Sequence, residues 1–189
     1  ESAMMMYERV TAALGERPPA IGHAEMRQRQ LDFCSELPTD CVAIIANNPT
    51  AIRSRDTHHR HRFNSYLHYL TGWHGEEGVA VFYFDGDEWK CHLYVQPRDV
   101  EKETWTGRRP GLEGALANWP IDQSVDRENI VSDLTKMIES AAVIYHIQNL
   151  DEIVDDIVNT SAKEVRDPRK ILDNMRVIKS DAEIALMQY

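Results

Sequence analysis

The sequence has little cysteine and no cysteine pattern that would build a cross-linked or metal-bound framework. Its three cysteines are an odd number, and none belongs to a C-x-x-C pair. This spacing argues against disulfide bonds and against a structural zinc site, and it favours a reducing compartment. We therefore expect all three to be small, buried hydrophobic residues, namely Cys34, Cys41 and Cys91.

The sequence also lacks a long apolar run and an excess of basic residues. No stretch approaches the roughly 18 apolar residues of a membrane-spanning helix, and the N-terminus lacks the apolar centre of a signal peptide. The 31 acidic residues outnumber the 21 basic ones, and the resulting net charge of −10 would repel nucleic acid and anionic lipid. We expect a soluble, cytoplasmic protein with no nucleic-acid or membrane partner.

The standard catalytic signatures are absent as well. There is no G-x-S-x-G elbow, Walker loop, G-x-G-x-x-G or H-E-x-x-H motif. The sequence "HHRH" at 58–61 has the composition of a metal-binding tract. However, the arginines within and around it would repel a cation, and neighbouring residues of an extended segment point in opposite directions. We interpret 53–62 as a polar loop without a metal, with a docking or ligand-gating surface as the alternative.

The hydrophobic pattern predicts a single α/β domain, a mixed β-sheet flanked by helices. Apolar residues at helical spacing predict one helix over 25–37 and another across 126–140. A third helix is expected to begin near Leu150, with an apolar stripe of Leu150, Ile153, Val154, Ile157 and Val158, and to end at Arg166-Asp167-Pro168. Short apolar runs predict strands at 41–47 and 141–147, and the Asp85-Gly86 dipeptide predicts a hairpin between two further strands. Ser180 and Glu183 have the spacing of a capping box, so a further helix is expected to start there.

A second stretch with chemical potential is "ETWTGRRPG" at 103–111, in which an indole stands beside a glycine turn and two guanidinium groups. One interpretation is a solvated turn with a packed tryptophan. The other is an exposed aromatic and cationic lip that touches a peptide or a neighbouring subunit, because Trp and Arg dominate interface anchors.

Four motifs in order resemble the N-terminal domain of the aminopeptidase P family, which belongs with the creatinase and prolidase-like peptidases. The first is "RSRDTHHRHRFNSYLHYLTG" (53–72), and the second is "EKETWTGRRPG" (101–111). The strand sequence "IYHIQN" (144–149) and the final "MRVIKSDAEIALM" (175–187) complete the set. The resemblance implies a creatinase-like N-terminal domain over 23–175, preceded by an extension (1–22) and followed by a linker and the first helix of a catalytic domain (176–189).

The resemblance implies that this chain is not itself catalytic. Family enzymes remove the N-terminal residue that precedes proline, by metal-assisted hydrolysis. Their two divalent metals, expected to be manganese, are held in the C-terminal domain by two Asp, one His and two Glu that lie beyond Tyr189. We expect no cofactor in this chain. Its expected partners are its own catalytic domain, further copies of itself in a dimer or tetramer, and peptide substrates.

The resemblance also implies which residues face the substrate. Trp105 matches a tryptophan that reaches a neighbouring subunit's active-site mouth, and Asp56 matches an acidic residue on the same approach. The cationic partner is expected at Arg169 or Lys170, and the paired guanidinium groups of the second motif are Arg108 and Arg109. The histidine run replaces a Tyr-Pro-x-Arg-Gln stretch of the family, and we expect it to be a loop that enters a strand at a subunit or domain surface.

Two other functions fit the same motifs. The chain is alternatively the binding module of a peptidase-like protein that has lost catalysis, as in a histone chaperone with this architecture. It is also compatible with an accessory domain of a prolidase or creatinase, although the W-x-G-R-R-x-G match favours aminopeptidase P.

Overall fold

The computed structural model describes residues 22–49, 64–101, 109–177 and 187–188. Within these ranges six strands form one sheet in the order β4-β3-β2-β1-β5-β6. In chain order the elements are α2 (His23–Ser35), β1 (Cys41–Ala46), α3 (Ser65–Thr71), β2 (Val79–Phe84), β3 (Trp89–Val95), α5 (Gly111–Asn118), β4 (Gln123–Asp126), the 3₁₀ turn η1 (Arg127–Asn129), α6 (Ile130–Ser140), β5 (Val143–His146), α7 (Glu152–Thr160), β6 (Glu164–Arg166) and α8 (Arg169–Val177).

The sheet is mixed, as the sequence predicts. β1 pairs antiparallel with β2 and parallel with β5, and β2 pairs antiparallel with β3. β4 runs parallel to β3, and β6 runs parallel to β5. Among the described strands, β2 therefore runs against all the others, whose carboxyl ends meet at one edge of the sheet.

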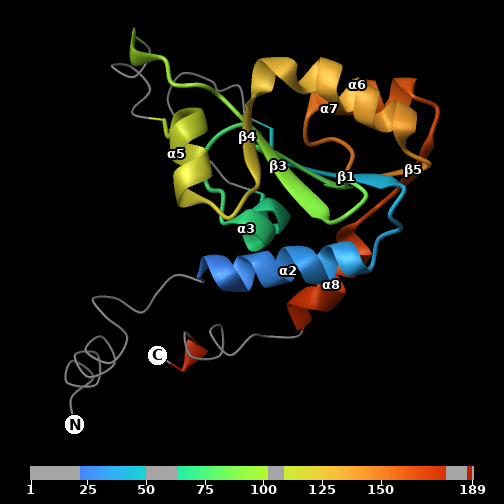
Figure 1. Ribbon diagram of the computed structural model, residues 1–189, viewed down its shortest axis with the longest axis horizontal. Helices are drawn as coiled ribbons and strands as arrows, with labels where there is room; N and C mark the ends of the chain where they lie inside the picture. The colour runs from blue at the N-terminus through green and yellow to red at the C-terminus, as the bar shows by residue number, and fades with distance from the viewer. Residues whose placement is uncertain (1–21, 50–63, 102–108, 178–186, 189) are drawn as a thin grey trace, which may run out of the picture.

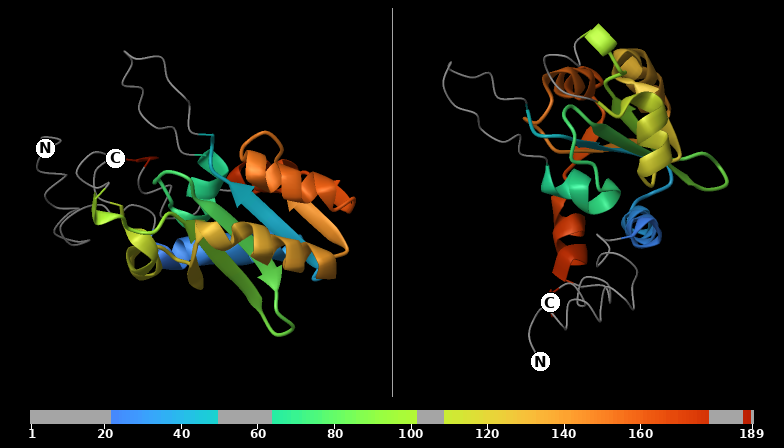
Figure 2. Two further views of the ribbon diagram at one scale, coloured as in Figure 1. Left: turned by 90° about the horizontal axis from the view of Figure 1, so that it is seen from above. Right: turned by 90° about the vertical axis from the view of Figure 1, so that its left-hand side faces the viewer.

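Helices cover both faces of this sheet. Figure 1 shows α6 and α7 on one face and α2, α3 and α8 on the other, and the turned views in Figure 2 show the same layers. The central strand β1 explains this arrangement, because its side chains alternate between two cores. Ala43 and Ile45 pack with α2, α3, α5 and α8, whereas Val42 and Ile44 pack with α6 and α7. Because both faces of β1 are buried, nearly every residue of the strand is apolar, which explains the continuous apolar run at 41–47.

The predicted hairpin is confirmed. β2 and β3 pair from Val79 with Tyr94 to Phe84 with Trp89, and Gly86 takes the positive φ (106°) of the turn between them. Asp85 Oδ1 accepts hydrogen bonds from the backbone N–H of Asp87 and Glu88, at 2.9 Å each. These two bonds hold the pKa of Asp85 below its usual value, because they favour the charged carboxylate.

The predicted helices over 25–37 and 126–140 are confirmed as α2 and α6, with slightly different bounds. The three cysteines are buried, as expected. Burial raises the pKa of Cys34 to about 12 and that of Cys41 to about 11, and it raises the pKa of Cys91 further. These thiols therefore behave as core residues rather than as nucleophiles.

Several expectations are wrong. The third predicted helix, α7, ends at Thr160 instead of at Arg166-Asp167-Pro168, and the strand β6 intervenes. Its apolar stripe stops at Val158, after which Ala162 takes a positive φ (56°) that turns the chain. The aromatic stretch after the histidine run forms α3 rather than a strand, because Asn64 caps its first turn and Gly72 ends it in the left-handed region. Ile153, expected in the buried stripe, is 46% exposed.

Candidate functional site at the carboxyl edge of the sheet

All five predicted site residues lie on segments that leave the carboxyl edge of the sheet. The segment between β1 and α3 carries Asp56, and the segment between β3 and α5 carries Trp105, Arg108 and Arg109. Arg169 is the first residue of α8 and is separated from the end of β6 by Asp167 and Pro168. Asp56, Trp105, Arg108 and the histidine run 58–61 lie outside the described residues. Ligands bind at this edge in many α/β folds, because loops from several strands converge there.

Asn47 joins the two ends of the segment that carries Asp56. Its side-chain Oδ1 accepts hydrogen bonds from the backbone N–H of Asn48 (2.9 Å) and of Asn64 (2.8 Å). Its Nδ2 donates to the carbonyl oxygen of Gly75 at 2.8 Å. Asn47 is 3% exposed and Asn64 is 7% exposed, so these bonds are made away from bulk water, where an unpaired amide is costly.

Asn64 adds a second connection at the same place. Its Nδ2 donates to Asn48 Oδ1 at 3.0 Å, and its Oδ1 caps α3 by accepting from the backbone N–H of Tyr66 and Leu67. The helix that follows the segment is therefore started by the same residue that closes it.

The segment that carries Trp105 is closed by packing. Gly111 begins α5 with φ 68°, and a Cβ built on it would lie 2.7 Å from Arg98 Cγ and 3.3 Å from the Arg98 backbone nitrogen. The chain after β3 and the chain before α5 thus touch at a point where only glycine fits without strain. Arg109, two residues earlier, is half-buried.

A polar pocket of about 540 Å³ lies at this edge, between the ends of β1 and β5. Arg127 Nη2 contacts Asp151 Oδ2 at 2.5 Å, and the side chains of both residues are largely buried. Asp151 Oδ1 also caps α7 by accepting from the backbone N–H of Val154 at 3.1 Å. Two other residues that line the pocket, Glu77 and Asn149, have positive φ angles of 52° and 70°. This backbone conformation is costly for Glu77, whereas asparagine adopts it more readily, and costly conformations concentrate at binding and active sites.

Arg169 does not present an uncompensated charge. Its Nη2 and Nε contact Asp167 Oδ2 at 2.6 and 2.9 Å, and both side chains are about half exposed. These charge-assisted bonds hold the pKa of Asp167 below its usual value.

α8 is joined to α3 by an aromatic and cationic cluster. The Arg176 guanidinium carbon lies 4.9 Å from the centre of the Tyr66 ring and 5.4 Å from that of Tyr69. Arg176 Nη2 also donates to the Ser65 carbonyl oxygen at 3.0 Å, and the Tyr66 hydroxyl donates to Asp173 at 2.8 Å. Burial and this hydrogen bond raise the pKa of Tyr66.

Sequence reasoning missed Asn47, Asn64, Arg127 and Asp151. Asn64 had a local signal, since an Asn directly before a run of helix-forming residues is a capping pattern. Arg127 had no local signal, because its partner Asp151 is 24 residues away in the sequence.

The described ranges hold neither a cluster of metal-ligating side chains nor a membrane-spanning helix. No three His, Cys, Asp or Glu side chains there come together in a way that could hold a metal ion. None of the helices in those ranges has both the length and the hydrophobicity that a membrane span requires.

Comparisons with known proteins give the same family as the motifs. The chain is 28% identical to the Xaa-Pro aminopeptidase of Haemophilus influenzae over 167 residues, which cover 87% of this chain and 39% of that protein. It is 28% identical to the Escherichia coli enzyme of the same name, over 89% of this chain and 42% of the relative. The chain therefore spans about two fifths of the length of the curated relatives it matches.

Solved structures match the fold as well. Zinc-substituted Escherichia coli aminopeptidase P in complex with product superimposes with a TM-score of 0.80 at 27% identity, over 88% of this chain and 41% of that one. Proline aminopeptidase P II from Yersinia pestis gives a TM-score of 0.78 at 29% identity, over 87% and 41%. The family model for the N-terminal domain of aminopeptidase P matches residues 23–145. The chain therefore belongs to the aminopeptidase P N-terminal domain family.

Proposed function

We propose that this chain is the non-catalytic N-terminal domain of a Xaa-Pro aminopeptidase, and that it serves subunit assembly and controls access of peptides to the active site. The parent protein would remove the N-terminal residue that precedes proline, and it would act in the cytoplasm as a dimer or tetramer. The catalytic machinery would belong to the C-terminal part of that protein.

One observation supports the access role above the others: the predicted site residues all belong to segments that follow strands at the carboxyl edge of the sheet. Asp56, Trp105 and Arg169 come from three different loops, which leave β1, β3 and β6 at that edge. The loop ends are fixed by the Asn47 bonds and by the contact of Gly111 with Arg98. An edge at which the ends of the segments are fixed in this way suits substrate positioning, because rigid elements support it.

The chemistry assigned to this chain is binding and orientation. An indole at Trp105 would pack against the proline ring or another apolar face of the substrate, and Asp56 would pair with a substrate cation or a neighbouring arginine. Two divalent metals, expected to be manganese, would lower the pKa of a bridging water and polarise the attacked carbonyl when bound in the C-terminal domain. Arg169 would orient peptides less strongly than an unpaired arginine, because Asp167 already neutralises much of its charge.

The test uses the full-length protein and a series of Xaa-Pro peptides of increasing length. We expect Trp105→Ala and Asp56→Ala each to lower kcat/KM for the longer peptides about tenfold, mainly through KM, because these groups bind substrate without touching the reacting atoms. Leu116→Ala on the exposed side of α5 is the control and should leave kcat/KM unchanged. Light scattering on the same proteins reports the oligomeric state.

The proposal would be wrong if both variants kept wild-type kcat/KM at every peptide length and the parent protein were a monomer. Absence of all Xaa-Pro hydrolysis by the wild-type protein, with manganese present, would instead indicate a binding module.

A further inference from the structure

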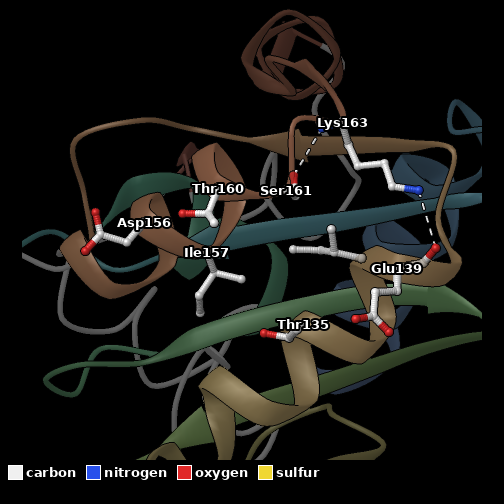
Figure 3. Close-up of a pocket in the computed structure, with 8 residues that line it drawn as sticks. Thr135, Glu139, Asp156, Ile157, Thr160, Ser161 and Lys163 are labelled. Atoms are coloured by element: carbon white, nitrogen blue, oxygen red, sulfur yellow. Dashed lines mark hydrogen bonds between the residues drawn. The ribbon is translucent and has the colours of Figure 1, made fainter.

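The layer formed by α6 and α7 carries a groove that the proposed function does not use. The groove measures about 490 Å³, a size typical of ligand sites, and lies between the C-terminal halves of the two helices. Figure 3 shows Thr135 and Glu139 from α6 on one side, and Ile157 and Thr160 from α7 on the other. Ile138, which is 2% exposed, contributes to the apolar floor.

The residues that line the groove have a net negative charge, because the carboxylates of Glu139 and Asp156 outnumber the ammonium group of Lys163. Its cation, Lys163, is already engaged, because its Nζ donates to the carbonyl oxygens of Glu139 (3.3 Å) and Ala141 (2.8 Å) at the negative end of the α6 dipole. Among the residues that the structure describes, the carboxylates of Glu139 and Asp156 have no ion-pair or hydrogen-bond partner. The two helices that form the groove, α6 and α7, together carry five Asp and Glu against one lysine.

We propose that this groove binds a peptide segment of a partner protein in which an aliphatic side chain is flanked by lysine or arginine. Ile138 and Ile157 would cover the aliphatic side chain, so that both apolar surfaces leave water. Glu139 and Asp156 would pair with the flanking cations, which selects a basic segment over an acidic one. The groove lies on the opposite face of the sheet from α8 (Figure 1), and the inference does not depend on the proposed peptidase function.

Fluorescence anisotropy with a labelled nine-residue peptide tests this inference. The probe contains two leucines, each preceded by two lysines, and its matched control replaces both leucines by alanine. We expect the chain to bind the leucine peptide at least fivefold more tightly than the alanine peptide, and to bind it more weakly as salt is raised. Glu139→Gln together with Asp156→Asn should weaken binding of the leucine peptide about five- to tenfold without affecting folding, because both side chains are exposed.

The control is a second double variant with the same charge change, Glu36→Gln together with Glu113→Gln. Both residues are exposed, on or beside α2 and α5, which pack on the other face of the sheet. This variant should bind as the wild type does. Equal weakening by the two double variants, equal affinity for the two peptides, or no binding of the leucine peptide at low salt would each overturn the inference.

Discussion

At the scale of single residues, each side chain that stabilises the carboxyl edge makes two separate sets of contacts. Asn47 bonds both ends of one loop, Asn64 closes that loop and caps α3, and Asp151 caps α7 and pairs with Arg127. Each of these groups is largely buried, so losing a partner costs more than one hydrogen bond in water would contribute.

Substitutions at Asp151 can separate its capping of α7 from its ion pair with Arg127. Asp151→Ala removes the cap and leaves Arg127 without its carboxylate in a largely buried site, so we expect it to lower the free energy of unfolding by about 2–4 kcal/mol. Asp151→Asn keeps a good capping acceptor and loses the charge, and it should cost about 1–2 kcal/mol. Urea unfolding measures both values, and Arg127→Gln with the double variant isolates the pair. An Asp151→Asn protein as stable as the wild type would mean that the ion pair contributes nothing.

At the scale of elements, the sequence predicted the segments with a strong apolar pattern and missed those without one. α2, β1, the β2 and β3 hairpin, α6, β5 and the start of α7 were predicted because their apolar spacing is visible locally. The elements α3, α5, β4, β6 and α8 were not, since each is short and its apolar spacing is weak. β6 illustrates this, because all three of its residues are exposed and it exists through pairing with β5.

The same reasoning explains what was predicted of the site. Asp56, Trp105 and Arg169 were predicted from the family resemblance, which does not require knowledge of the fold, and they stay predictions. The hydrogen bonds of Asn47 with Asn64 and Gly75, and the ion pair of Arg127 with Asp151, join residues that are 17 to 28 positions apart in the sequence. Neither set of contacts therefore has a local sequence pattern. Only the sheet order brings these residues to one edge.

We expect Arg176 to control how firmly α8 is attached to α3. Arg176→Ala removes the contacts with Tyr66, Tyr69 and Ser65, so we expect amide hydrogens of α8 to exchange about tenfold faster, while those of β1 keep their protection. Lys170→Ala removes a cation from the same helix at an exposed position and is the matched control. Equal exchange in the two variants would show that Leu172, the buried residue of α8, holds the helix without help.

At the scale of the whole molecule, the central strands connect the two cores. β1 and β5 contribute alternate side chains to both, so loss of packing on one face removes support from the other. The described tryptophans, Trp73, Trp89 and Trp119, all lie in or against the core shared with α2, α3 and α8. Their fluorescence therefore reports unfolding of one face, whereas circular dichroism reports the helices of both.

This arrangement predicts that a substitution in the core under α6 and α7 changes the unfolding transition measured by tryptophan fluorescence. Leu134 of α6 is fully buried in the other core, and Leu134→Ala should lower the free energy of unfolding by about 2–4 kcal/mol. If the domain unfolds as one cooperative unit, the urea midpoints from fluorescence and from circular dichroism shift together. Val131→Ala, on the exposed side of the same helix, should move neither midpoint measurably. A fluorescence midpoint that stayed at the wild-type value, while the dichroism midpoint fell, would mean that the α6 and α7 layer unfolds separately from the sheet.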